Sequence, residues 1–419
     1  MIVSENIRNN LLIFMLGVAM VCMLFTKFVL SMSLIGILIV LVFTKREGDA
    51  YKIALNADIF KVVTYRQKLW PFTGFIIYFL WIVLSLFWSF DHVSFWFDDV
   101  LSKLGVIGIA FIFIFLNKSD LLSGHKSDYK INILLFLHLV FFGALLISSL
   151  LVLSLYIPNF EEINYMIGKG RPIPTPIDHV RYSIMIAYAA LSSISFLFLS
   201  KKLNPHKWIY IILAIYFFVF SHILAVRSGL FLLYSGIFII IIYAIFKYRK
   251  YLLGIAFLLL IISIPIVAYV ALPSFKTKVA YTKYDIEQYL YFDGNNYSDG
   301  DRIRSIQNGI ILWKGNPIFG LGGGDYKLES RIFQEKTQAN YRNLLPHNQF
   351  IRTGMAYGII GVILLIGAFL YAIFYRKGYK NLLLLLVLQV FFFSLFVESN
   401  LERYYSLVFF FLFLGMSVW

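Results

Sequence analysis

Several arginines and a single histidine, side chains that could carry chemistry, lie in the polar stretch of residues 301–358. Arg302 and Arg304 stand near its start, and His347 follows Pro346 at the entry to an apolar run. Guanidinium groups bind phosphate oxygens through bidentate, charge-assisted hydrogen bonds. A neutral imidazole held at a helix end can remove a proton from a hydroxyl group. These residue types indicate a phosphate or diphosphate bound next to a hydroxyl acceptor, although arginines on an outward helix also occupy plain solvated faces.

Two further arginines could converge on the same place. Arg227 lies in AVRSGL, where two apolar runs are joined with almost no loop, so its charge is near membrane depth. A charge there usually faces a cavity or a partner, and snorkelling to the interface or pairing with a structural carboxylate explains it equally well. Arg181 follows a segment that three prolines at alternate positions make stiff and extended. We expect Arg227 and Arg302 to contact the anion, and add Arg181 on position alone.

Glycines crowd the middle of the polar stretch, in FGLGGGDY. Gly320 and Gly322 belong to a turn with unusual backbone angles. This turn either cradles a phosphate or lets two backbone segments pack closely, and the second interpretation is favoured. It is not a nucleotide P-loop, because no Lys-Ser/Thr pair follows. No HExxH or DxD pattern accompanies His347, and the single cysteine, Cys22, lies in the first apolar run. The sequence therefore predicts neither a metal site nor a cofactor.

The elements that position these residues are apolar helices. The chain has 419 residues, of which 60% are hydrophobic and 14% charged, more apolar surface than a soluble domain of this size can bury. Separate apolar runs of membrane-spanning length predict an all-α polytopic membrane protein of about twelve transmembrane helices. The runs lie at 10–26, 28–44, 70–90, 99–116, 131–156, 179–200, 207–225, 229–246, 251–272, 354–375, 380–397 and 403–418.

Loop charges predict the orientation of these helices. The formal net charge is +15, and most of the excess lies in short loops that alternate with neutral or acidic ones. The positive-inside rule puts the basic loops and both termini in the cytoplasm, which explains the charge without nucleic acid. Residues 1–272 then hold helices 1–9, 273–353 form a large outward loop, and 354–419 hold helices 10–12, all within one integral domain.

The outward loop carries helical patterns of its own. Ile303, Ile306, Ile310 and Trp313 recur at helical spacing, which predicts a helix that lies along the membrane surface or covers the bundle and ends at residues 315–317. Residues 325–338 predict a second, polar helix.

The order of these motifs resembles that of the O-antigen ligase and polymerase superfamily of bacterial inner-membrane glycan transferases. The run DR-x14-PIFGLGGG is followed by HNQFI and GIIG, and AVRSG is similar to the family's other arginine motif, which puts Arg227 in register. One departure is Ala356, nine positions after the histidine, where many members carry Glu. The positions that fall on the family pattern are Arg302, Pro317, Gly320, Gly322, His347, Asn348, Phe350 and Gly358.

The resemblance implies a multi-pass glycosyltransferase of the bacterial inner membrane whose active site faces the periplasm. Its donor would be a glycan on undecaprenyl diphosphate, with Arg227, Arg302 and Arg181 as diphosphate contacts and Gly320, Gly322 and Asn348 as supporting residues. His347 would act as the base without a metal ion, and such a base contributes about 10²–10⁴-fold. Guanidiniums that stabilise the departing diphosphate meet the other requirement.

The resemblance is greatest to the O-antigen ligase, whose acceptor is a sugar hydroxyl of lipid A–core. An O-antigen polymerase and a protein O-oligosaccharyltransferase share the donor chemistry and differ in the acceptor. A transporter or flippase for lipid-linked glycans is the alternative from another class, but the chain lacks an internal two-fold repeat and a matched pair of broken helices. Glu398, on the expected outer face, is an alternative base that ranks below His347.

Overall fold

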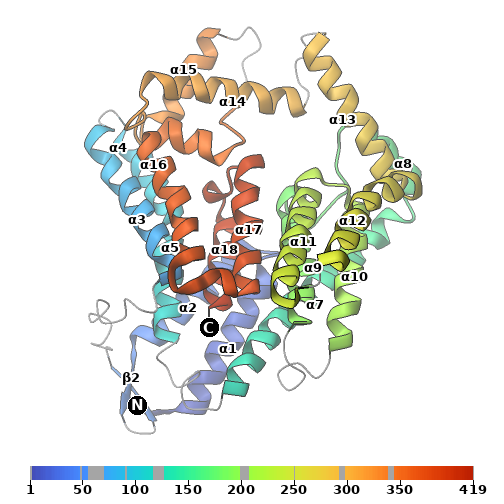
Figure 1. Cartoon of the computed structure of the whole chain (residues 1–419). Helices are drawn as coiled ribbons and strands as arrows, with labels where there is room; N and C mark the ends of the chain where they lie inside the picture. Colours follow the sequence, from blue (N-terminus) through green and yellow to red (C-terminus); the bar gives the residue numbers. More distant parts are fainter. Residues whose placement is uncertain are drawn as a thin grey trace.

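A computed structural model describes residues 2–47, 50–54, 70–89, 92–116, 127–198, 207–249, 251–291, 298–337 and 344–418. Helices account for most of these residues and form a bundle with a cap at one end (Figure 1). The bundle helices are α1 Glu5–Cys22, α2 Lys27–Val42, α3 Trp70–Leu84, α4 Val93–Lys103, α5 Gly105–Leu116, α7 Ser127–Tyr156, α9 His179–Phe196, α10 Lys207–Leu224, α11 Arg227–Tyr248, α12 Tyr251–Ala271, α16 Gln349–Phe374, α17 Leu382–Val397 and α18 Tyr404–Ser417.

The predicted class, an α-helical membrane protein, is confirmed. In the described part of the chain, 6 helical segments are long and apolar enough to cross a membrane: Trp70–Trp88, Val93–Leu116, Ile133–Tyr156, Lys207–Leu224, Arg227–Tyr248 and Gln349–Lys380. Four shorter apolar helices accompany them, at Ile7–Cys22, Lys27–Val42, Leu382–Val397 and Tyr404–Ser417. The expected total of about twelve spans stays a prediction, because several apolar helices are shorter than a full crossing.

One feature of the fold was not expected from the sequence. Three short strands, β1 Ile2–Ser4, β2 Thr44–Glu47 and β3 Ala50–Ile53, form an antiparallel sheet in the order β1-β3-β2. By composition, residues 44–53 resemble a charged loop between two apolar runs. The sequence pair Gly48-Asp49 between the last two strands, of a type that favours two-residue hairpins, is the signal that was available.

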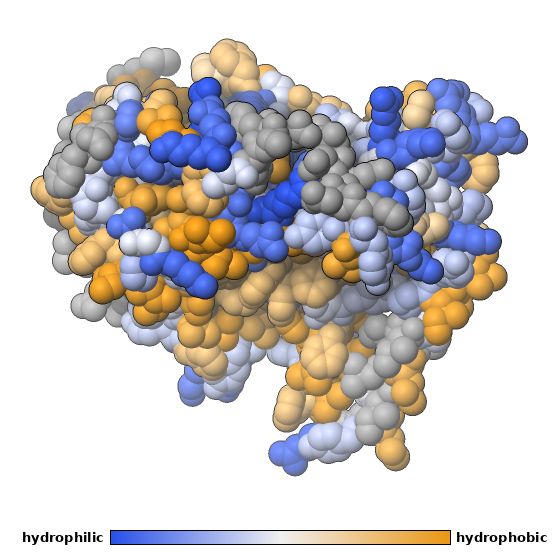
Figure 2. Space-filling model, turned by 90° about the horizontal axis from the view of Figure 1, so that it is seen from above, coloured by the Kyte–Doolittle hydropathy of each residue, from blue (hydrophilic) through white to orange (hydrophobic). Residues whose placement is uncertain are grey.

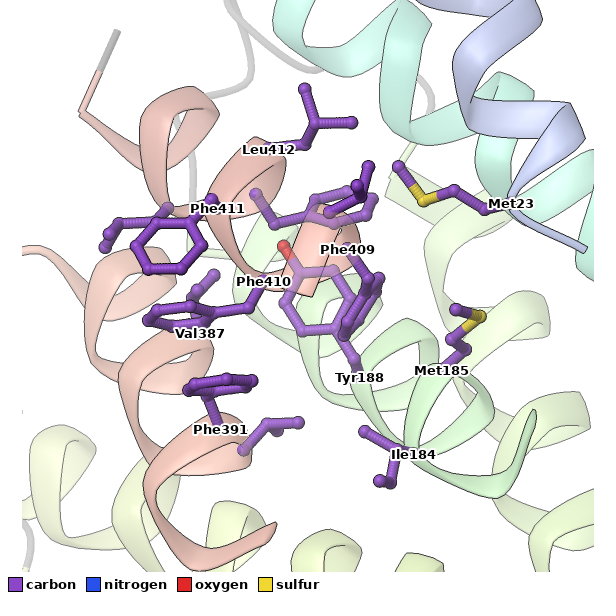
Figure 3. Packing of buried hydrophobic residues seen from close by; sticks show 14 of the residues in the cluster. Met23, Ile184, Met185, Tyr188, Val387, Phe391, Phe409, Phe410, Phe411 and Leu412 are labelled. Atoms are coloured by element: carbon purple, nitrogen blue, oxygen red, sulfur yellow. The ribbon is translucent and has the colours of Figure 1, made fainter. Parts of the chain in front are cut away.

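The core of the bundle lies around α18, which is buried on almost every side. Phe410 of α18 stacks on Phe391 of α17 with 3.7 Å between ring centroids, and Phe409 of α18 meets Tyr188 of α9 edge to face (Figure 3). Edge-to-face aromatic pairs such as Phe409 and Tyr188 stabilise packing beyond their buried area. The turn between α17 and α18, residues 398–403, is therefore held by two tightly packed helices.

The cap consists of helices from the predicted outward loop. α13 Pro273–Tyr291, α14 Ser298–Gly315 and α15 Tyr326–Thr337 lie at the end of the bundle away from the N terminus, with α14 running across the top (Figure 1). The two loop helices predicted from the sequence are thus confirmed as α14 and α15. α13 was missed because its sequence is mostly polar, although Phe275, Val279, Ile286 and Leu290 recur at helical spacing and were the available signal. The short helix α8, Phe160–Gly168, packs beside α13.

Candidate active site

His347, Glu398 and Arg302 form a chain of contacts that connects the bundle to helix α14 of the cap. One carboxylate oxygen of Glu398, Oε1, accepts a hydrogen bond from Arg302 Nη2 at 2.8 Å, and the other, Oε2, lies 3.3 Å from His347 Nδ1. The Glu398 side chain is only 12% exposed, whereas that of His347 is 35% exposed. Nε2 of His347 has no hydrogen-bond partner among the residues that the structure describes. When Nδ1–H donates to the carboxylate, Nε2 is left as a proton acceptor that solvent and substrate can reach.

The start of α16 places His347. Asn348 is the N-cap of this helix, and its Oδ1 accepts from the backbone N–H groups of Phe350 and Ile351 at 3.0 and 3.1 Å. Its Nδ2 donates to the carbonyl oxygen of Phe396 at 3.1 Å. The HNQF motif thus joins the helix start to the end of α17. Asn348 supports the histidine as a helix cap and takes no part in the glycine turn.

Gln349 makes a second connection between α16 and the turn that carries Glu398. It is fully buried. Its Oε1 accepts from the backbone N–H of Leu401 at 3.1 Å, and its Nε2 donates to Glu402 Oε1 at 3.3 Å. The position of Glu398 relative to His347 therefore follows from contacts that hold residues 347–349 against residues 396–402.

The glycine turn packs into a break in α16. Gly358 has φ 67°, which interrupts the helix, and the segment 317–322 supplies the missing partners. The N–H groups of Leu321 and Gly322 donate to the carbonyls of residues 355 and 356 at 2.9 and 2.8 Å. A side-chain carbon on Gly320 would lie 2.6 Å from the backbone of residues 356–358. The turn needs glycine because two backbones meet there, which is the close-packing interpretation.

The remaining glycine donors are also used within the protein. The backbone N–H of Gly323 donates to Ser85 Oγ at 3.3 Å, and that of Gly324 donates to Ser89 Oγ at 2.7 Å. A phosphate cradle would leave such donors pointing at a ligand. Ala356, the departure from the family pattern noted in the sequence, is 1% exposed beside this turn, so an acid at that position would be buried.

Arg227 and Arg302 line one cavity of about 120 Å³. Lys278 of α13, His179 and Ser228 also line it, and among the described residues in its wall there is no carboxylate. Arg227 is the first residue of α11, and Ala225, with φ 51°, allows α10 to turn into α11 within two residues. The N-terminus of a helix favours an anion, and three cationic side chains add to that field. On the face of the molecule that carries the cap, seen from above in Figure 2, hydrophilic residues gather around a hollow near the middle.

Arg181 lies in a different cavity from Arg227 and Arg302. Its Nη1 is 3.3 Å from Asp178, which also caps α9, and its Nε is buried without a hydrogen-bond partner. The residues around it, in a cavity of about 470 Å³, include Glu402 and Arg403. The expectation that Arg181 shares the diphosphate site remains a prediction, and this geometry does not favour it.

Sequence reasoning missed a buried ionic network beside the site. Lys103 Nζ lies 2.9 Å from Asp99 and 2.8 Å from Glu402, and Arg352 Nη2 lies 3.6 Å from Glu402. Burial raises the pKa of the Glu402 carboxyl, but Lys103 and Arg352 outweigh burial and lower the pKa to about 2. Tyr326 of α15 donates to Asp99 at 3.3 Å. The network fixes the 398–403 turn, and the Asp99–Lys103 pair, four residues apart within an apolar run, was the available signal.

The fold and the site together define a multi-pass α-helical membrane protein with a cationic cavity joined to a histidine under a helical cap. In the described part of the chain, no group of three or more His, Cys, Asp or Glu side chains could hold a metal ion.

The sequence is also similar to known proteins. The family model described as O-antigen ligase matches residues 213–366, which include Arg227, Arg302 and His347. The resemblance to the O-antigen ligase superfamily is thereby confirmed. A protein of Haemophilus influenzae, described as uncharacterized, is 30% identical over 224 residues, which cover 50% of this chain and 54% of the relative. The match therefore spans about half the length of that relative.

Proposed function

We propose that the protein is an O-antigen ligase that transfers a glycan from undecaprenyl diphosphate to a sugar hydroxyl of lipid A–core. The observation that carries this proposal is the double role of Arg302. It lines the cationic cavity, and through Glu398 it is linked to His347. A transferase needs an anion site beside a base, and one arginine joins the two here.

The donor diphosphate occupies the cavity of Arg227, Lys278 and Arg302 in this proposal. During transfer the bond from the sugar C1 to the phosphate oxygen breaks, and negative charge develops on the leaving diphosphate. Fixed cations aimed at that charge stabilise the transition state more than the ground state. Guanidiniums suit the task because their planar fork can donate two hydrogen bonds to one phosphate group, so the proposed mechanism is metal-independent.

An adjoining apolar groove supports a lipid-linked donor. This groove, of about 560 Å³, runs between α11 and α13 and shares Arg227 and Lys278 with the cationic cavity. Phe275, Val279, Ile286 and Leu290 of α13 line it. An isoprenoid chain fits such a wall, with its diphosphate held at the basic end.

The acceptor hydroxyl approaches His347. Its proton passes to Nε2 as its oxygen bonds to the sugar C1, and Glu398 stabilises the imidazolium that forms, by holding Nδ1–H. Glu398 is therefore assigned as the partner of the base. Its carboxylate is already shared between Arg302 and His347, so it is a poor candidate for the base itself. In this proposal the reaction takes place at the periplasmic face of the inner membrane, and both termini are cytoplasmic.

Reconstitution tests the function. Purified protein in detergent is incubated with an undecaprenyl-diphosphate glycan and lipid A–core, and the products are identified by mass spectrometry. Glycosylated lipid A–core is the expected product. A longer lipid-linked glycan would instead identify a polymerase, and a glycosylated protein acceptor would identify a protein O-oligosaccharyltransferase. Absence of any transferred glycan, combined with donor movement across vesicles, would favour the transporter alternative.

A further inference from the structure

A second apolar groove lies at the end of the bundle opposite the cap. It has a volume of about 610 Å³, within the range of sites that hold a small organic ligand. Phe238, Ile242 and Phe246 recur every fourth residue along α11 and form one wall, and Leu385 of α17 lines the other side. Unlike the groove beside α13, it shares no lining residue with the cavity of Arg227 and Arg302. It is therefore separate from the candidate active site.

Two lysines line one end of this groove. Nζ of Lys247 lies 5.7, 5.4 and 5.6 Å from the ring centroids of Phe198, Tyr243 and Tyr248. Tyr243 in turn donates to the backbone carbonyl of Lys380 at 3.2 Å, which brings the segment of the second lysine to the same end. Aromatic faces hold an ammonium group in place without neutralising it. The groove thus combines an apolar wall with a positively charged end.

We propose that this groove binds an anionic phospholipid. The acyl chains lie along the α11 wall, and the phosphate lies between Lys247 and Lys380. An anionic headgroup is favoured over a zwitterionic one because the latter brings its own cation toward the two lysines. Tyr243 and Tyr379 suit the interfacial depth that this arrangement requires, since tyrosine places its ring in the apolar region and its hydroxyl in the polar region. The site is independent of the proposed transferase activity.

Lipid titration monitored by native mass spectrometry tests the proposal. The full chain, purified in a neutral detergent, is titrated with phosphatidylglycerol and with phosphatidylcholine of identical acyl chains. The wild type is expected to bind phosphatidylglycerol more tightly. In K247Q/K380Q, affinity for phosphatidylglycerol should fall about five-fold for each lysine removed, and the preference should disappear. K247R/K380R should retain the preference because the charges remain.

Two further variants separate this site from a general effect of charge. K314Q/K336Q removes the same charge from exposed positions on α14 and α15, at the other end of the molecule, and should leave the preference unchanged. I242W fills the groove and should weaken binding of both lipids. Equal binding of the two lipids by wild type would overturn the proposal. A preference that survives in K247Q/K380Q, or that is lost to the same extent in K314Q/K336Q, would also overturn it. If K247Q/K380Q does not fold, unchanged phosphatidylglycerol binding by I242W decides against the site.

Discussion

Replacing Glu398 by glutamine tests the link between the cationic cavity and the base. Gln is nearly the same size as Glu, but it removes the negative charge that Arg302 contacts at 2.8 Å and His347 at 3.3 Å. The neutral amide can no longer stabilise an imidazolium, and its NH₂ group can turn toward Nδ1 and favour the wrong tautomer. The expected result is a lower kcat with a folded protein.

The size of the effect follows from the contact that is lost. A hydrogen bond to a charged group contributes about 1.5–3 kcal/mol, and each 1.36 kcal/mol corresponds to a factor of ten in rate. E398Q should therefore lower kcat about 10- to 160-fold. The lower half of that range is expected, because 3.3 Å is long for a charge-assisted hydrogen bond. H347A should cost about 10²–10⁴-fold, the typical contribution of a general base.

The assay measures glycan transfer from the lipid-linked donor to lipid A–core by purified protein at saturating substrate. E335Q is the matched control, because Glu335 on α15 is an exposed partner of Arg331, 2.9 Å away, and the chemical change is identical. It should leave kcat unchanged. In an H347A background, E398Q should cost much less than in wild type, since residues that act as a unit are not additive. The same fold loss in both backgrounds would refute the idea that Glu398 acts through His347.

Three other outcomes are expected. R302K should lower kcat/KM for the donor at least about tenfold, because lysine cannot reproduce the guanidinium fork, and unchanged donor kinetics would remove Arg302 from the diphosphate site. G358A should lower the unfolding temperature in detergent, because its new side-chain carbon would lie 1.9 Å from a backbone carbonyl oxygen and the positive φ alone costs about 1–3 kcal/mol. The control variant G143A should leave the unfolding temperature unchanged, because no atom lies within 4 Å of its new carbon. The lowered pKa of Glu402, about 2 against an ordinary value of 4.5, contributes stability that is present above about pH 5 and is lost as the pH falls toward 2. E402Q should therefore be less stable than wild type at pH 7 but lose less stability on acidification, and parallel thermal unfolding curves from pH 7 to 3 would contradict this.

The sequence predicts the helical membrane class and the two cap helices α14 and α15. Both predictions rest on local patterns. The length of an apolar run indicates a membrane-spanning helix, and the spacing from Ile303 to Trp313 indicates one face of a helix. α13 was missed because its mostly polar composition hid the helical spacing from Phe275 to Leu290. The strands β1, β2 and β3 were missed because each is only 3 or 4 residues long.

The arrangement of the candidate site depends on packing between distant segments. Glu398 is 51 residues from His347 along the chain, and it meets the histidine because α16, α17 and α18 pack together. Arg227 of α11 and Arg302 of α14 line one cavity although they are far apart in the chain, whereas Arg181 lines another cavity, where it contacts Asp178. The sequence added Arg181 to Arg227 and Arg302 on position alone, and only the structure showed that it lines a different cavity.

The sequence by itself therefore determined the helical membrane class, the motifs and the kinds of chemistry that arginine and histidine allow. The tertiary structure decided which of these residues meet, that the glycine turn closes a break in α16, and that Glu398 is a partner of His347. The physical reason is the range of the interactions: helix formation depends on neighbours within a few residues, whereas a cavity and a shared carboxylate depend on contacts between helices far apart in the chain.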